Sequence, residues 1–132
     1  MKECKFCKIA EGQLPSYNLY EDEKFFAFLD RSPIQEGHFI IIPKKHSEYI
    51  FDLEEPDYTE LMKLAKKLSA KLKEATKTKK IGLAVEGFGE DHLHIHLVPL
   101  QQLGDLDPCK HKRAMDDHLQ MLHKKLLPFF NS

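Results

Sequence analysis

Three histidines alternate with aliphatic residues in the segment 91–99, which reads DHLHIHLVP. A period of two predicts a β-strand that turns His92, His94 and His96 to one face and the aliphatic side chains to the other. Imidazole is suited to nucleophilic attack and to proton transfer near neutral pH, and it is also a common metal ligand. The segment is therefore the first candidate for chemistry in this chain.

Three interpretations of these histidines compete. They could bind a catalytic metal, since two histidines spaced by one residue on a strand can share an ion. One of them could be a nucleophile that its neighbours orient, or all three could be polar residues on a solvated strand face. The spacing alone leaves these alternatives open.

A second candidate is Cys4-Lys-Phe-Cys7. Two cysteines at this spacing can bind one tetrahedral zinc ion, although redox dithiols use the same spacing. His46 and one histidine of the 91–99 segment could complete a zinc site. The chain has 3 cysteines, an odd number that argues against a disulfide framework and favours a reducing, cytosolic location.

The elements that must position these residues follow from periodicity. A helical apolar stripe is predicted where Leu61, Ala65, Leu68, Leu72 and Ala75 repeat at spacings of four and three. Strands are expected at 19–20, 25–29, 39–42 and 81–85, the last antiparallel to the histidine strand. A C-terminal helix is expected over about 107–128, capped by Asp107 with Pro108 in its first turn and with an apolar stripe of Met115, Leu119, Leu122 and Leu126.

This pattern predicts an α+β fold: one antiparallel sheet, a long central helix and a C-terminal helix. A length of 132 residues fits a single domain over 1–132. The net charge of -1 gives no electrostatic reason to expect a nucleic acid or an anionic membrane surface as partner. No apolar run approaches the roughly 20 residues of a membrane-spanning helix.

Several motifs in a fixed order make the chain similar to a known family. They are C-x-x-C-K-I from Cys4, the aromatic strand that ends in Leu29-Asp30, the segment from Gly37 to Pro-Lys-Lys-His46, and H-x-H-x-H. Together they resemble the histidine-triad (HIT) family of nucleotide hydrolases and transferases, in its zinc-bearing, HINT-like branch. The resemblance runs from about residue 4 to 99 and implies the HIT-like fold.

The resemblance implies roles for two triad residues. His94 matches the nucleophile, which attacks the α-phosphorus of a nucleotide ester, anhydride or phosphoramidate to form a nucleotidyl-histidine that water then hydrolyses. In relatives, a backbone carbonyl near the triad holds the other imidazole nitrogen. His96 matches the residue that contacts the phosphate and helps to protonate the leaving group. A histidine there, in place of glutamine, favours water as the final acceptor.

The resemblance also implies a nucleotide pocket. Asp30 matches the carboxylate that binds the ribose hydroxyls, and a carboxylate accepts two such hydrogen bonds. Phe26 and Leu29 match positions that line a purine-base pocket, and Ile34 and Phe6 are further candidate walls. For these apolar residues, plain core packing is the alternative interpretation.

The loop before the triad departs from the family pattern. It is short, and Val85 replaces an asparagine that relatives often carry, so the usual polar contacts to phosphate are missing. Backbone amides at Gly87 and Gly89 could replace them, because glycine lets the chain approach a phosphate closely. Glu90 and Asp91 are acidic and disfavour highly charged polyphosphates, unless they point away.

Zinc-bearing relatives imply a complete ligand set of Cys4, Cys7, His46 and His92, so the metal would be structural. The expected function is purine nucleotide hydrolysis, on nucleoside phosphoramidates or dinucleoside polyphosphates, with an AMP or GMP moiety bound and a homodimer as the assembly. The alternatives are a metal-dependent hydrolase that uses all three triad histidines and a nucleotide-binding regulatory protein with slow turnover. His38 receives no role, because it matches a variable position of the family.

Overall fold

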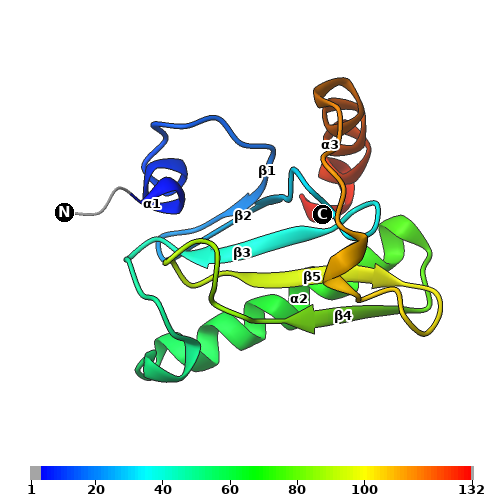
Figure 1. Cartoon of the computed structure of the whole chain (residues 1–132). Coiled ribbons are helices and arrows are strands. Elements are labelled where there is room, and N and C mark those ends of the chain that lie inside the picture. Colours follow the sequence, from blue (N-terminus) through cyan, green and yellow to red (C-terminus); the bar gives the residue numbers. More distant parts are fainter. Residues whose placement is uncertain (1–3, 132) are drawn as a thin grey trace.

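Five antiparallel strands form one sheet in the order β1-β2-β3-β5-β4 in the computed structural model, which describes residues 4–131 (Figure 1). The elements are α1 (Lys5–Ala10), β1 (Asn18–Glu21), β2 (Phe25–Leu29), β3 (Phe39–Pro43), the 3₁₀ turn η1 (Ile50–Asp52), α2 (Asp57–Thr76), β4 (Lys80–Ala84), β5 (Ile95–Leu100), the 3₁₀ turn η2 (Pro108–Lys110) and α3 (Asp116–Phe130). The predicted α+β class with an antiparallel sheet, a central helix and a C-terminal helix is confirmed. The ends of the predicted 1–132 domain, residues 1–3 and 132, lie outside the described residues.

The sheet is covered on both faces, and strand β2 shows how the sequence achieves this. All five of its residues are buried. Phe25, Ala27 and Leu29 belong to the larger core, which includes the buried faces of α2 and α3. Phe26 and Phe28 belong to a second cluster with Phe6 and Ile9 of α1. Because successive strand residues point to opposite faces, a run of five apolar residues supplies both cores.

The predicted stripe of α2 is confirmed, since Leu61, Ala65, Leu68, Leu72 and Ala75 are all buried. The helix ends at Thr76 and is capped by Lys77, which adopts the left-handed conformation with φ 57°.

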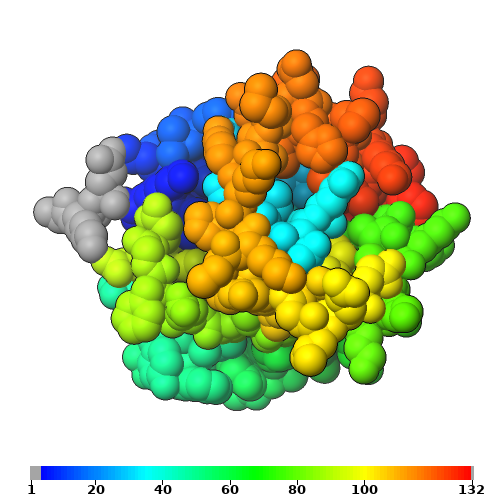
Figure 2. Space-filling model, turned by 45° about the vertical axis from the view of Figure 1, so that its right-hand side comes forward, coloured from blue at the N-terminus to red at the C-terminus, as the bar shows by residue number. Residues whose placement is uncertain are grey.

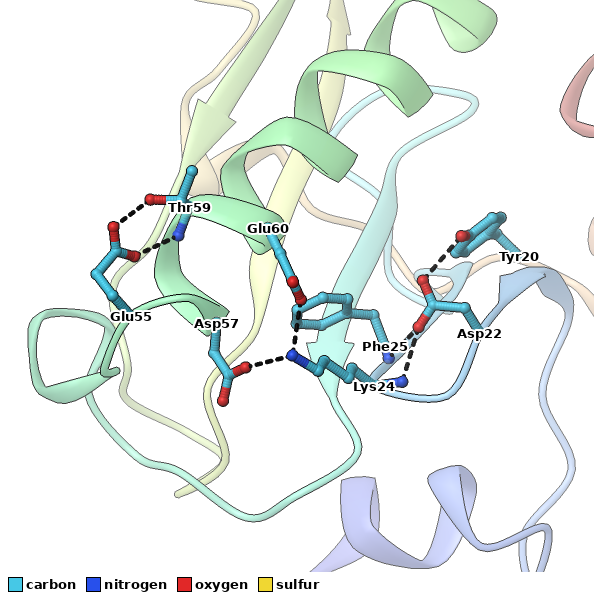
Figure 3. Close-up of polar contacts among 8 residues, drawn as sticks. All are labelled: Tyr20, Asp22, Lys24, Phe25, Glu55, Asp57, Thr59 and Glu60. Atoms are coloured by element: carbon cyan, nitrogen blue, oxygen red, sulfur yellow. Dashed lines mark hydrogen bonds and ion pairs between the residues drawn. The ribbon is translucent and has the colours of Figure 1, made fainter.

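The start of α2 is tied to the turn between β1 and β2 (Figure 3). Lys24 Nζ lies 2.8 Å from carboxylate oxygens of both Asp57 and Glu60 in the first turn of the helix. At the other side of the turn, Asp22 accepts the backbone N–H groups of Lys24 and Phe25 at 2.8 and 2.7 Å. The side chains involved in the ion pairs are exposed, so these contacts orient the helix more than they stabilise it.

The antiparallel pairing of 81–85 with the histidine segment is confirmed, with Ala84 opposite His96. The extent of the predicted histidine strand is wrong, however, because β5 begins only at Ile95. Before it, the Leu93 N–H donates to the carbonyl of Ser47, and the carbonyl of His92 accepts from a side chain. The alternation of faces survives, since Leu93, Ile95 and Leu97 all lie in the larger core.

The predicted start of the C-terminal helix, at about residue 107, is also wrong. Asp107 and Pro108 begin the 3₁₀ turn η2, and α3 starts at Asp116. Between them the backbone pairs with the loop after β2: Lys112 N–H donates to the Pro33 carbonyl and Ala114 N–H to the Arg31 carbonyl. This orange segment crosses the molecule beside the cyan loop before β3 (Figure 2).

Of the predicted C-terminal stripe, Leu119, Leu122 and Leu126 are buried, whereas Met115 is 75% exposed and lies outside the helix. Across residues 4–131, no helix combines the length and the apolar character needed to cross a membrane.

Candidate active site

His94 lies in the extended segment just before β5, with only 6% of its surface exposed. Its Nδ1 lies 2.7 Å from the backbone carbonyl oxygen of His92. A carbonyl can only accept, so Nδ1 carries the proton and Nε2 keeps its lone pair. The ring of Phe6 packs edge-on against His94, with the centroids 5.1 Å apart. The neutral form of this side chain is therefore the tautomer whose basic nitrogen is Nε2.

His96 follows on β5, with its ring centroid 4.9 Å from that of His94. Its Nδ1 lies 2.9 Å from Nε2 of His38, a residue for which the sequence predicted no role. His38 precedes β3 and is 2% exposed. The register of β3 and β5 brings the two together, because Ile40 lies opposite His96.

The environment keeps these two rings neutral. Burial lowers the pKa of His38 to about 4, against the opposing charge of Asp30. Burial also lowers the pKa of His96, and the neighbouring His94 adds to the effect, while Asp30 and Glu86 oppose it. In a buried site, the charged form of an imidazole loses more solvation than the neutral form.

A cavity of about 520 Å³ opens in front of the triad, within the size range of small-molecule sites. It lies between α1, the end of β2, the triad and the segment before α3. Its lining combines apolar side chains with polar and charged ones, as is usual where a small ligand is oriented by a few groups. The lining residues are Lys5, Phe6, Ile9, Leu14, Pro15, Ser16, Phe28, Leu29, Asp30, Arg31, Ser32, Ile40, His94, His96 and Arg113.

Several predicted site residues line this cavity and others do not. Asp30, Leu29 and Phe6 are in the lining, but Phe26 and Ile34 are outside it. Phe26 and Leu29 stand three positions apart on β2 and so face opposite sides of the sheet. Phe28 lines the cavity on the face that it shares with Phe26.

Gly87 and Gly89, which were predicted to contact the phosphate, are not among the residues that line the cavity. Both have positive φ, 87° in each case. Gly87 faces the carbonyl of Glu48, in the loop after β3.

Cations line the cavity at positions that sequence reasoning missed. Lys5 comes from α1, Arg31 from the loop after β2 and Arg113 from the segment before α3. Arg31 also stacks over the ring of Tyr17 and donates to the Pro15 carbonyl. No local motif marks Arg113, because it reaches the cavity only through the backbone pairing of Lys112 and Ala114 with the 31–33 loop.

The four predicted metal ligands form a cluster at the other end of the triad. The donor atoms of Cys4, Cys7, His46 and His92 all lie within 4.8 Å of one another. Each of three sulfur–nitrogen pairs is close: Cys4 Sγ lies 3.2 Å from His92 Nδ1, and Cys7 Sγ lies 3.3 Å from Nδ1 of both histidines. These spacings suit the edges of a tetrahedron with zinc–sulfur bonds of about 2.3 Å and zinc–nitrogen bonds of about 2.0 Å.

The partners of the two histidines also suit a metal. His92 Nε2 lies 2.7 Å from the carbonyl of Pro43, and His46 Nε2 lies 3.5 Å from a carboxylate oxygen of Glu48. The Pro43 carbonyl accepts the Nε2–H of His92, which leaves Nδ1 of His92 free to coordinate, and Glu48 lies on the Nε2 side of His46. Burial lowers the pKa of His92 and favours its neutral, metal-binding form. The group therefore allows zinc binding.

Comparison with known sequences assigns the chain to a family. A sequence model of the HIT domain matches residues 11–103, more than half of the chain. The chain belongs to the HIT family. The lining residue Arg113 lies beyond the matched range, as do both cysteines of the metal cluster.

Relatives and solved structures of the HIT family extend the likeness over almost the whole chain. The adenosine 5'-monophosphoramidase of Saccharomyces cerevisiae is 35% identical over 132 residues, which cover 94% of this chain and 80% of the yeast protein. A hypothetical histidine triad nucleotide-binding protein of Sulfolobus tokodaii superposes with a TM-score of 0.85 at 33% identity, covering 97% of this chain and 92% of that one. A zinc-bound histidine triad family protein of Mycobacterium smegmatis superposes at 0.79 with 26% identity, covering 97% and 93%.

Proposed function

We propose that this HIT protein hydrolyses purine nucleotides at the α-phosphate, with nucleoside phosphoramidates as the main substrate class and dinucleoside polyphosphates as the second. Nε2 of His94 attacks the α-phosphorus, and the bond to the leaving amine or phosphate breaks with its electron pair on the leaving group, which takes a proton. Water then attacks the nucleotidyl-histidine, and the nucleoside monophosphate leaves.

The observation that carries this proposal is the contact between His94 Nδ1 and the backbone carbonyl of His92. A nucleophilic imidazole needs a free lone pair that points at the substrate, and the 2.7 Å contact from Nδ1 to the His92 carbonyl provides it. The carbonyl also stabilises the positive charge that develops on the ring as the phosphorus bond forms.

The rest of the cavity suits a nucleotide. Asp30 lines the cavity, and its Oδ1 accepts the backbone N–H of Ser32 at 2.8 Å, which fixes the carboxylate. Its Oδ2 lies 3.4 Å from Nε2 of His38 and 3.8 Å from Nδ1 of His96. Phe6, Ile9 and Phe28 offer the apolar faces on which a purine packs. The yeast relative is named a monophosphoramidase, in agreement with the proposed substrate class.

Zinc is proposed as a structural ion held by the Cys4, Cys7, His46 and His92 group. All four positions of a tetrahedral ion would be filled, so the metal would supply no open site and would only tie the N-terminus to the triad. A zinc-bound relative supports this assignment. The expected homodimer and cytosolic location also stay predictions; β4 is an edge strand on which Leu83 is 42% exposed, which leaves room for a partner.

The metal-dependent alternative finds less support. It needs all three triad histidines on one ion. Among residues 4–131, the potential metal-binding groups separate them: His92 joins the cysteines, and His96 joins Asp30 and His38. Nδ1 of His94 is already occupied by a carbonyl.

Replacement His94→Ala tests the proposal. With adenosine 5'-phosphoramidate as substrate, kcat should fall at least ~10³-fold, because the nucleophile is lost. AMP affinity by calorimetry should stay within about threefold of the wild type, since Ala removes no charged contact to the phosphate. His118→Ala is the matched control, an exposed histidine on α3 outside the cavity lining.

A second measurement separates the rivals. Acid quench of the wild type during turnover should trap a nucleotidyl adduct on a peptide that contains His94. Unchanged hydrolysis by His94→Ala would overturn the proposed mechanism. Loss of activity on brief chelation with full recovery on adding metal, without any adduct, would favour the metal-dependent hydrolase. Tight AMP binding with no turnover by the wild type would favour a regulatory role.

A further inference from the structure

Arg113 is a cation in the cavity lining that the proposed chemistry does not use. It comes from the segment between η2 and α3, beyond the part of the chain that matches the HIT domain. Among residues 4–131, its side chain forms no hydrogen bond, ion pair or ring contact. A guanidinium group offers five N–H donors and stays charged at physiological pH. Arg113 can therefore bind an anionic group of a ligand.

The backbone places the side chain of Arg113 beside Ser32. The N–H groups of its two neighbours in the chain donate to the carbonyl groups on either side of Ser32. These hydrogen bonds have the spacing of an antiparallel pair, in which Arg113 and Ser32 lie directly opposite each other without a hydrogen bond between them. The side chains of such a pair project to the same face and lie close together. Both of them line the cavity, in agreement with this register.

Ser32 in turn lies next to the carboxylate that is proposed to bind the ribose. Its backbone N–H donates to Asp30 Oδ1 at 2.8 Å, and Asp30 Oδ2 lies 3.8 Å from Nδ1 of His96. Contacts therefore connect the triad, Asp30, Ser32 and Arg113 in that order along the cavity. With the α-phosphate at the triad and the ribose hydroxyls at Asp30, Arg113 lies beyond the ribose.

A second guanidinium group adds positive charge at this end of the cavity. Arg31 also belongs to the lining, and it stacks over the ring of Tyr17 and donates to the Pro15 carbonyl. Burial and a carboxylate partner raise the pKa of the Tyr17 hydroxyl, whereas the charges of Arg31 and Arg113 oppose this rise. Both guanidinium groups therefore lie near the same hydroxyl.

The charge of the lining exceeds what a nucleoside phosphoramidate would neutralise. Three cations, Lys5, Arg31 and Arg113, accompany one carboxylate, that of Asp30. A nucleoside 5'-phosphoramidate has a single negative charge, on its α-phosphate. A phosphate monoester adds a charge of about −1.5 to −2 at pH 7. A nucleotide with a further phosphate would therefore match the excess of positive charge better.

We propose that Arg113, together with Ser32 and Arg31, forms a subsite for a second phosphate on the 2' or 3' oxygen of the ribose. The inference rests on the proposed function, which sets the direction of the nucleotide in the cavity. The substrate class is then the 5'-phosphoramidates and 5'-anhydrides of nucleosides that carry this phosphate. The planar guanidinium fork matches phosphate oxygens, and the Ser32 hydroxyl is a further donor. Asp30 binds the ribose hydroxyl that remains free.

Calorimetry with four nucleotides and the full-length protein tests the subsite. Adenosine 3',5'-bisphosphate and adenosine 2',5'-bisphosphate carry the second phosphate on the ribose, whereas ADP carries it on the α-phosphate and AMP lacks it. The wild type should bind one of the bisphosphates about tenfold more tightly than AMP or ADP, because charge-assisted bidentate contacts are strong. The bisphosphate that binds more tightly identifies the ribose oxygen.

Variants of Arg113 separate a specific contact from general attraction between charges. Arg113→Gln should abolish the preference for the bisphosphate, while its affinity for AMP stays within about threefold of the wild type because distant charges are screened. Arg113→Lys should keep only part of the preference, since the charge remains but the planar fork is lost. The matched control is Lys112→Gln, which removes an exposed cation outside the cavity lining and keeps the backbone hydrogen bond to Pro33. It should bind all four nucleotides as the wild type does.

Equal binding of AMP and both bisphosphates by the wild type would overturn the inference. A loss in Arg113→Gln that is as large for ADP as for the bisphosphates, or that Lys112→Gln reproduces, would also overturn it. Binding is measured without turnover, so the two proposals can fail separately. A wild type that prefers a bisphosphate but hydrolyses no phosphoramidate supports the subsite and contradicts the proposed function. Hydrolysis of adenosine 5'-phosphoramidate without this preference contradicts the subsite alone.

Discussion

At the residue scale, the chemistry of the site depends on which nitrogen of each histidine carries a proton. His92, His94 and His96 are chemically identical, but their partners at Nδ1 differ: a cysteine pair, a backbone carbonyl and the ring of His38. We propose them as a metal ligand, a nucleophile and a phosphate contact, in that order. Asp30, beside them, has one oxygen occupied by the Ser32 N–H and the other turned toward the histidines.

Replacement Asp30→Asn should weaken substrate binding through the ribose. The asparagine oxygen can still accept the Ser32 N–H, so the turn survives while one anionic acceptor is lost. A hydrogen bond to a charged group contributes about 1.5–3 kcal/mol, so KM for adenosine 5'-phosphoramidate should rise roughly tenfold or more. Steady-state kinetics would measure this.

A matched control for Asp30→Asn is Asp107→Asn, whose carboxylate accepts the Cys109 N–H in a similar turn outside the cavity lining. With a 2',3'-dideoxy substrate, Asp30→Asn and the wild type should differ little. An equal loss on the dideoxy substrate would contradict ribose recognition by Asp30.

At the element scale, helix α1 depends most on its contacts with the rest of the protein for stability. It has 6 residues, too few for an isolated helix to be stable. Its inner face, Phe6 and Ile9, packs on β2 and β3 and walls the cavity. The thiols of Cys4, its N-cap, and of Cys7 lie against His46 and His92, so a zinc ion would tie α1 to the loop after β3 and to the triad.

Loss of the zinc ion that would link α1 to the triad should lower both the stability of the fold and its affinity for nucleotide. Zinc at about 10³ times its dissociation constant would stabilise the fold by about 4 kcal/mol. Cys7→Ser should therefore lose zinc and lower Tm by roughly 10 °C. AMP affinity should fall with it, because Phe6 loses its anchor. Metal analysis, scanning calorimetry and titration with AMP would measure the three effects.

Cys109→Ser is the control for the zinc experiment, because Cys109 is exposed and outside the metal cluster. It should keep the zinc content, the Tm and the AMP affinity of the wild type. A Cys7→Ser protein that retained one zinc per chain would show that these four residues are not the ligands.

At the scale of the whole molecule, the C-terminal segment is built into the same core as the HIT domain. Leu119, Leu122, Leu126 and Phe130 of α3 are buried in the cluster that includes α2 and the sheet. The segment before α3 brings Arg113 to the cavity. The residues beyond the family match at 103 therefore contribute both to stability and to the pocket.

Replacement Leu126→Ala tests this integration. Leu126 is 0% exposed, so its truncation should lower the free energy of unfolding by about 2–5 kcal/mol. Denaturant unfolding should remain a single transition. Met121→Ala, on the same helix and 61% exposed, should change stability by less than about 0.5 kcal/mol. A second transition, or equal effects of the two variants, would show that α3 folds separately from the sheet.

Much of the fold could be predicted because the relevant signals are local. The stripe from Leu61 to Ala75 and the alternation of Leu93, Ile95 and Leu97 each depend only on the period of one element. The start of α3 could not be predicted in this way. Asp107 and Pro108 form a good helix start, but the following residues hydrogen-bond to the Arg31–Pro33 loop, far away in the sequence.

By itself, the sequence determined the elements, the face on which the triad lies, and a set of cysteines and histidines with the right chemistry for zinc. Only the tertiary structure decided the differences among residues of one type. Phe28 lines the cavity whereas Phe26 does not, and Arg113 is also among the lining residues. His38 contacts His96, which lies 58 residues away in the sequence. The physical reason is that periodicity is a property of one segment, whereas the lining of the cavity and the contact between His38 and His96 bring together strands and loops that are far apart in the sequence.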